Sequence, residues 1–383
     1  MTRKCGMLFE MPVPREPRPG EKHTAFDSEG QPYEVEAVFT PELTERSFHD
    51  VVEQAVQAEK CGYDSVWFVE HHFYEEASQS SAPDVMLAHI AARTERIRLG
   101  HGVRLLPYNY NHPVRVAESA AVLDILSHGR LDFGTGRSLS RLELEGFGIN
   151  PADTREQWEC SLDIILDAWT KEVVERSEGD IVFPPRSVVP KPVQQPHPPL
   201  WAATTGAPGH ELMGRKGLGL LSFTLMLPLE ELASRIALYR EGIKHADPVG
   251  HFVNDQVAAM TMVYCAEDGD VARERAGAAV MRYLEWAFGA FVGAAKWMDP
   301  REGSYNYLQE MMGIDFEQLT FDVVNDNDMV IVGSPDECAK KAERYFEAGV
   351  DQMLCQTTLP GIPHEAVMES IELFGREVIP RIT

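Results

Sequence analysis

The fold is indicated by one stretch near the N-terminus, Asp64-Ser65-Val66-Trp67-Phe68-Val69-Glu70-His71-His72-Phe73, where a continuous apolar run ends in a carboxylate and two imidazoles. A strand that is apolar on both faces belongs to a parallel sheet covered by helices. In a closed parallel barrel, the carboxyl ends of the strands form the active face. We therefore expect Glu70, His71 and His72 on that face. Taken alone, the His-His pair also fits a hydrogen-bonded core histidine beside a surface one.

The rest of the chain contains further apolar runs of this kind. Short apolar runs alternate with longer amphipathic runs, which is the pattern of successive βα units. The apolar runs that read as strands are 4–10, 64–73, 97–103, 129–137, 200–206, 217–224, 256–265 and 352–356. Amphipathic runs such as 83–93, 114–126, 154–169, 229–245, 335–348 and 364–379 read as covering helices. The order predicts an α/β fold, a TIM (β/α)8 barrel with insertions.

Two segments interrupt the repeat. Residues 11–39 form a long connection rich in proline and charge, and such loops are usually functional or disordered. Residues 268–329 form a large insertion that is dense in aromatic side chains and methionine. These side chains either roof a substrate pocket or pack a subunit interface. We expect one domain over residues 1–383, with the insertion at about 268–329.

Composition excludes several classes of partner. The chain has 35 basic and 60 acidic residues, and its formal net charge of -25 opposes affinity for nucleic acid or anionic membranes. No apolar run approaches the length of a bilayer span, and the N-terminus lacks the pattern of a signal peptide. The 6 cysteines are scattered, which fits a reducing cytoplasm. An anionic cofactor must then be held by local groups, such as an arginine or backbone N–H groups.

Small residues at strand ends indicate where a ligand lies. Gly100 and Gly102 near the end of the third strand suggest close approach to the backbone. The fourth strand ends in Gly134-Thr135-Gly136-Arg137, which places an arginine on the active face with room for a ligand beside it. The turn Thr204-Thr205-Gly206-Ala207 is a reasonable phosphate cradle, although an ordinary tight βα turn has the same composition.

Taken in order, these motifs resemble the bacterial luciferase-like flavin monooxygenases. The resemblance rests on Glu70-His71-His72-Phe73, Arg98-Leu99-Gly100-His101-Gly102-Val103 followed by His112-Pro113-Val114-Arg115, the run 129–137, Pro190-Lys191-Pro192-Val193-Gln194 and the turn 204–207. It covers the chain from 4 to 379, apart from 11–39 and the insertion. It implies an enzyme that takes reduced FMN from a flavin reductase and oxygenates a small organic substrate with O2 through a flavin C4a-hydroperoxide. We also expect a cytoplasmic homo-oligomer, a dimer or tetramer.

The resemblance also implies roles for single residues. His71 matches the essential histidine near the flavin C4a edge, Glu70 matches its polar neighbour, and His72 is the second histidine to test. Arg137 matches the arginine that binds the flavin phosphate. The other implied cofactor contacts are Thr205, Gly206 and Ala207 at the phosphate, Ser222 and Phe223 against the isoalloxazine, and Gly102-Val103, where the luciferase catalytic subunit has a cis peptide.

The sequence departs from the luciferase pattern at two positions. Gly136 stands where luciferase has a cysteine beside the flavin, and Phe223 stands where it has tryptophan. We therefore expect a monooxygenase that does not emit light. Metal catalysis is not expected, because neighbouring residues on a strand point to opposite faces and Glu-His-His cannot converge on one ion without a bulge.

Three alternatives remain at this stage. The first is a deazaflavin-dependent hydride-transfer enzyme of the same superfamily. The second is a non-catalytic flavin-binding partner subunit, against which the presence of both His71 and Arg137 argues. The third is an unrelated TIM-barrel enzyme with a phosphorylated substrate, because the fold alone specifies no function.

Overall fold

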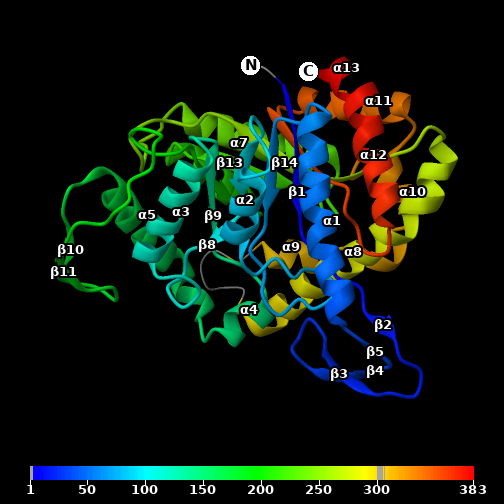
Figure 1. Ribbon diagram of the computed structural model, residues 1–383, viewed down its shortest axis with the longest axis horizontal. Helices are drawn as coiled ribbons and strands as arrows, with labels where there is room; N and C mark the ends of the chain where they lie inside the picture. Colours follow the sequence, from blue (N-terminus) through cyan, green and yellow to red (C-terminus); the bar gives the residue numbers. More distant parts are fainter. Residues whose placement is uncertain (1–2, 300–304, 306) are drawn as a thin grey trace.

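In the computed structural model, which describes residues 3–299, 305 and 307–383, the eight predicted strands form a closed parallel barrel (Figure 1). Their order around the barrel is β1 (Lys4–Phe9), β6 (Ser65–Phe68), β7 (Arg98–His101), β9 (Leu131–Gly136), β12 (Leu200–Ala203), β13 (Gly219–Phe223), β14 (Val257–Cys265) and β16 (Gln352–Gln356). The barrel closes because β16 pairs with β1. The predicted fold class is confirmed.

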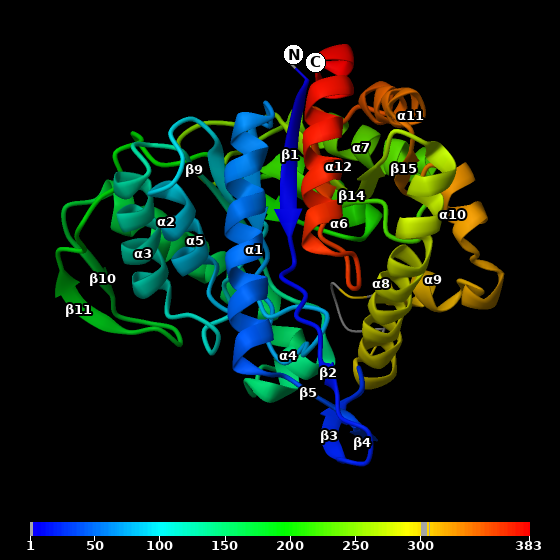
Figure 2. The same ribbon diagram turned by 45° about the vertical axis from the view of Figure 1, so that its right-hand side comes forward.

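Helices surround the barrel as predicted. They are α1 (Pro41–Lys60), α2 (Pro83–Ala91), α3 (Pro113–Leu126), α5 (Thr154–Thr170), α6 (Ala207–Arg215), α7 (Leu229–Ile243), α11 (Pro335–Glu347) and α12 (His364–Glu377). Several begin with proline, whose missing N–H loses no hydrogen bond in the first turn. Figure 2 shows α1 and α12 on either side of β1.

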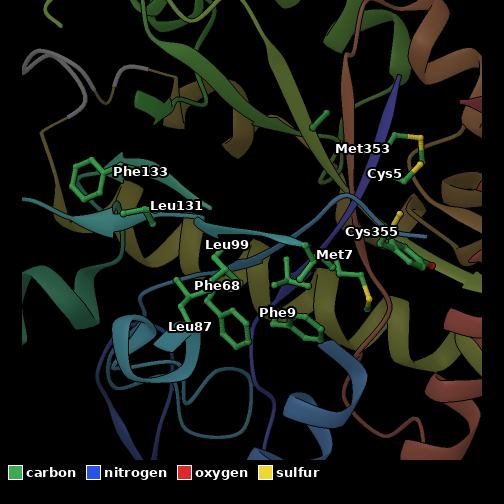
Figure 3. Close-up of a cluster of buried hydrophobic side chains, with 14 of the residues drawn as sticks. Cys5, Met7, Phe9, Phe68, Leu87, Leu99, Leu131, Phe133, Met353 and Cys355 are labelled. Atoms are coloured by element: carbon green, nitrogen blue, oxygen red, sulfur yellow. The ribbon is translucent and has the colours of Figure 1, made fainter. Parts of the chain in front are cut away.

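Each barrel strand buries both of its faces, which explains the continuous apolar runs. Met7, Phe9 and Phe68 lie in the layer between strands and helices, together with the other side chains of Figure 3. Leu8 and Trp67 point into the barrel, where the Trp67 ring meets that of Trp201 edge-on with centroids 5.4 Å apart. Gly100 is required by this interior packing, since a Cβ there would lie 2.1 Å from the Trp67 ring. The close approach predicted at this glycine is therefore made by a core side chain.

The described residues outside the repeat form short strands and helices. Within 11–39, β2 (Glu16–Pro17) pairs with β5 (Ala37–Val38), and β3 (His23–Phe26) pairs with β4 (Pro32–Val35). The proline-rich segment 182–199 contributes β11 (Phe183–Arg186), which pairs with β10 (Val174–Arg176). Short elements complete the barrel loops and the C-terminus: β8 (Arg104–Leu105), α4 (Arg141–Gly146), a 3-10 turn (Pro151–Asp153) and α13 (Ile379–Ile382).

The predicted insertion is mostly helical. It comprises α8 (Gly269–Trp297), α9 (Leu308–Met312), a 3-10 turn (Phe316–Gln318) and α10 (Phe321–Asp326), and β15 (Ile331–Gly333) then pairs with the end of β14. The long α8 runs beneath the carboxyl ends of the strands as drawn in Figure 1. No helix within the described residues is long and apolar enough to cross a membrane.

Candidate active site

A cavity of ≈ 340 Å³ opens at the carboxyl ends of the strands, and we call it the inner cavity. Its floor and sides come from the ends of β1, β6, β7, β9, β12 and β13 and from the loops that follow them. Side chains of the insertion cover it, namely Tyr283, Trp286, Ala287, Ala290, Phe291, Tyr305 and Tyr307. The insertion therefore covers this cavity, as expected on one of the two interpretations of its aromatic side chains.

His71 lines the inner cavity between two carboxylates. Its Nδ1 lies 2.9 Å from Oε1 of Glu143, and its Nε2 lies 3.6 Å from Oε2 of Glu10. Burial lowers the pKa of His71, but the charges of Glu143 and Glu10 and the hydrogen bond to Glu143 together raise the pKa to about 9. The ring is thus an imidazolium at neutral pH, with a proton on each nitrogen.

Glu143 and Glu10 were not predicted from the sequence. Glu143 lies on α4, is fully buried, and also accepts hydrogen bonds from the backbone N–H of His72 at 2.9 Å and from the Ser138 hydroxyl. Glu10 follows β1 directly, as Glu70 follows the β6 strand, so a carboxylate after a strand end was an available signal. Burial raises the pKa of Glu10, whereas the charge of His71 lowers it.

Tyr283 completes this buried group from the roof. Its hydroxyl donates to Oε1 of Glu10 at 2.9 Å. The second oxygen, Oε2, has no hydrogen-bond partner among the described residues, and Glu10 is only 4% exposed. A buried polar atom without a partner is uncommon in proteins, and this one lines a cavity. This oxygen faces the Nε2 atom of His71.

The three residues predicted as catalytic point in different directions. Glu70 lines the inner cavity, but its carboxylate is engaged by Arg104 at 2.8 Å, Asn111 at 2.9 Å and the backbone N–H of Leu105 at 2.7 Å. The Glu70 carboxylate therefore holds the loop after β7 in place. His72 does not line the cavity, and its ring packs against Tyr110, Phe147 and Phe73. Only His71 presents its ring to the cavity and to Glu10.

Two arginines lie at another part of the inner cavity. Arg137 follows β9, donates to the Thr154 hydroxyl at 3.2 Å, and lies 5.1 Å from the centroid of the Tyr305 ring. Arg155 from α5 also lines the cavity, although it was not predicted. Burial and the charge of Arg137 lower the pKa of Arg155. A bound anion between the two guanidinium groups would relieve their repulsion.

The predicted phosphate turn lies in the same cavity. Thr204, Thr205 and Gly206 line it, and so does Gly209 in the first turn of α6, whereas Ala207 does not. The N-terminus of a helix presents backbone N–H groups to an anion. A Cβ on Gly209 would lie 1.9 Å from Oγ1 of Thr204, so glycine is needed for this tight turn.

A buried histidine connects this turn to β13. His210 Nδ1 lies 3.0 Å from the Gly206 carbonyl oxygen, and Nε2 lies 3.1 Å from the Ser222 hydroxyl. Burial lowers the pKa of His210 to about 4, so the ring is neutral and carries one proton. A carbonyl only accepts, so Nδ1–H donates to Gly206 and Nε2 accepts from Ser222. Ser222 and Phe223, which were predicted to contact the cofactor, both line the inner cavity.

Gly102 and Val103 line the opposite part of the inner cavity, and the peptide bond between them is cis. Val103 also explains one departure from the luciferase pattern. A Cβ at Gly136 would lie 2.4 Å from Cγ2 of Val103, so Val103 occupies the space that a cysteine side chain would need.

Known proteins resemble this chain over most of its length. Residues 29–352 match the family model described as "Luciferase-like monooxygenase". The chain is similar to 4-hydroxyprotoasukamycin monooxygenase from Streptomyces nodosus subsp. asukaensis, with 31% identity over 336 residues, 86% of this chain and 85% of that protein. It is 28% identical over 339 residues to the alkanal monooxygenase alpha chain of Photobacterium leiognathi, covering 85% and 91%. The structure of monooxygenase RslO1 from Streptomyces bottropensis superposes with a TM-score of 0.76, 25% identity and coverage of 99% and 100%.

Proposed function

Because the chain belongs to the luciferase-like monooxygenase family, we propose that it uses reduced FMN and O2 to oxygenate a small organic substrate. A separate flavin reductase supplies the reduced cofactor. The observation that carries this proposal is that one covered cavity holds His71 between two carboxylates, together with two arginines and a helix N-terminus.

The residues of the inner cavity fit FMN. A flavin phosphate is a dianion, and Arg137, Arg155 and the N–H groups at the start of α6 supply the positive charge that the chain as a whole lacks. The apolar side chains Leu221, Phe223 and Met260 offer a surface for a flat ring. When bound, reduced FMN supplies the electrons with which O2 is activated.

The chain itself contributes protons and the exclusion of water. His71 Nδ1–H is held by Glu143, whereas the proton on Nε2 has its nearest carboxylate oxygen at the longer distance of 3.6 Å. His71 can donate this second proton to an oxygen atom in the cavity. When the ring is protonated again, the Glu10 carboxylate can stabilise its positive charge. Tyr283, Trp286 and Phe291 cover the cavity and limit the entry of water.

Anaerobic titration with reduced FMN tests the cofactor assignment. Arg137→Ala should weaken binding by about 1.5–3 kcal/mol, the usual value of a hydrogen bond to a charged group. Arg137→Lys should restore part of this loss, because a lysine lacks the planar fork. Arg141→Ala is the matched control, since Arg141 pairs with Glu145 and does not line the inner cavity. Equal affinity for reduced FMN in the parent and in Arg137→Ala would contradict the assignment of Arg137 to the flavin phosphate. Tighter binding of a reduced deazaflavin than of reduced FMN would favour a hydride-transfer enzyme.

Mixing the reduced complex with oxygen tests the role of His71. His71→Ala should bind reduced FMN as the parent does but lose most of its oxygenation, because a proton donor acts on the reacting atoms rather than on ground-state binding. Oxygen consumption and oxygenated product are measured together. Coupled turnover close to that of the parent would exclude the proposed proton transfer.

A further inference from the structure

A second and larger cavity of ≈ 560 Å³ lies beside the inner cavity, and we call it the outer cavity. Tyr74, Tyr283, Trp286 and Ala290 line both cavities, so the wall between them is one layer of side chains. The Trp286 ring contacts those of Tyr74 and Tyr283, with centroids 4.8 and 5.4 Å apart. The Tyr74 ring also lies 4.7 Å from that of His71. The outer cavity is therefore separated from the proposed reaction centre by the side chains of Tyr74, Tyr283, Trp286 and Ala290.

The outer cavity is built partly by the segment 11–39, which belongs to no βα unit. Its β3–β4 hairpin lies near the ends of α1 and α8 in Figures 1 and 2. Glu29 in the turn of the hairpin pairs with Lys296 of α8. A Cβ on Gly293 would lie 2.6 Å from the backbone oxygen of Ser28, so this glycine allows the hairpin to seat against α8. The β3–β4 hairpin thus packs against α8 and forms part of the wall of the outer cavity.

Aromatic surface at the outer cavity is left uncovered by the protein. Phe26 and Tyr33 of the hairpin are each 49% exposed, and Phe73 from the loop after β6 is 53% exposed. Large aromatic side chains gain most from burial, and exposed groups of them mark binding surfaces. A ligand with a planar ring would cover this surface.

The charges of the outer cavity indicate the second feature of the ligand. The lining carboxylates have partners in the chain: Glu75 with the Arg15 guanidinium, Glu76 with the backbone N–H of Arg15, Asp50 with His364, and Asp27 with backbone N–H groups of its own turn. The lining guanidinium groups of Arg46 on α1 and Arg282 on α8 are exposed and form no hydrogen bond or ion pair with a described residue, although burial raises the pKa of Asp50 and the charge of Arg46 acts to lower it. Both guanidinium groups can therefore still donate hydrogen bonds to an anion.

We infer that the outer cavity binds the non-reacting part of the substrate, a planar aromatic group that carries a carboxylate, with the carboxylate held by Arg46 and Arg282. Trp286, which is half-buried in the shared wall, moves aside so that the reacting end enters the inner cavity. This inference rests on the proposed function, because it describes the substrate of that reaction. Arginine suits the role, since its planar fork matches a carboxylate.

Calorimetric titration with 2-naphthoate, and with neutral 2-naphthamide of the same shape, tests the inference on cofactor-free and on FMN-loaded protein. Naphthoate should bind more tightly than naphthamide and should not compete with FMN. Arg282→Gln or Arg46→Gln should weaken naphthoate binding about tenfold or more, as expected for a lost charge-assisted hydrogen bond, and leave naphthamide binding nearly unchanged. Arg275→Gln is the control, since Arg275 lies on the same helix and pairs with Glu369 outside the cavity.

The outcomes separate the two proposals. If FMN does not bind but naphthoate binding depends on Arg282, the proposed cofactor is wrong and the outer site stands as an aromatic carboxylate site. If FMN binds but naphthoate does not, or if both probes bind equally in parent and Arg282→Gln, the outer site is excluded. Displacement of FMN by naphthoate would place the probe in the inner cavity and would also exclude the outer site.

Discussion

Replacing Glu143 with glutamine should lower the pKa of His71 while leaving the barrel intact. In the parent protein, burial lowers this pKa, and the charges of Glu143 and Glu10 outweigh burial and raise it from 6.5 to about 9. Glu143 is also the carboxylate in direct hydrogen-bond contact, with Oε1 2.9 Å from Nδ1. An opposite charge at this distance shifts a pKa by about 1–3 units, so we expect the variant to titrate between about 6 and 8.

NMR titration of histidine-labelled, cofactor-free protein measures this pKa directly. The chain has 13 histidines, and the His71 signals are assigned by their loss in His71→Asn. Glu145→Gln is the control, because Glu145 lies on the same helix but pairs with Arg141 at its surface. An unchanged His71 midpoint in Glu143→Gln would refute the electrostatic reasoning, whatever the effect on turnover.

The His71–Glu143 pair should make the free energy of unfolding decrease as the pH rises. The folded-state pKa of His71 is raised, so its protonation stabilises the folded state fully below about pH 6.5. That contribution is lost as the pH rises through about 9, and the shift corresponds to about 3 kcal/mol. Denaturation midpoints measured across this window should fall with rising pH in the parent and fall less steeply in Glu143→Gln. Identical pH dependence in the two proteins would contradict the assignment.

Three further changes test the packing around the site. Gly209→Ala places a Cβ 1.9 Å from Oγ1 of Thr204, so it should distort the phosphate turn and weaken FMN binding, measured by flavin fluorescence, without loss of secondary structure. Tyr283→Phe removes the hydrogen bond that lowers the pKa of Glu10, so an infrared band of a protonated buried carboxyl should persist to higher pH than in the parent. Gly214→Ala places a Cβ 2.4 Å from the backbone of α7 and should cost about 1–3 kcal/mol of folding free energy, measured by urea denaturation.

The fold could be predicted because its signal is local. Each barrel strand is buried on both faces, so each produces a continuous apolar run, and the intervening amphipathic runs produce the helical period. The same regularity places the residues that end the strands on one face, which is why His71, Arg137 and the turn at Gly206 were found without coordinates. Seen in the structure, the three do line one cavity.

Other features depend on contacts that leave no mark in the sequence. His71 and Glu143 are 72 positions apart in the sequence, and nothing in the sequence signals that the two side chains meet, yet their contact decides the charge of the ring. The glycine at position 100 was expected to allow a close approach to the backbone, and only the structure shows that the approaching group is the Trp67 ring. In both cases the partner comes from a distant part of the chain.

The outer cavity is the clearest example. Its walls come from the β3–β4 hairpin, α1, α8 and the loop after β16, which are far apart in the sequence. The sequence by itself determined the barrel and the face on which chemistry occurs, because hydrophobic periodicity is a property of neighbouring residues. Only the tertiary structure decided which charges are paired and which spaces remain open, because electrostatic energy and packing depend on distances between residues that the chain brings together from far apart.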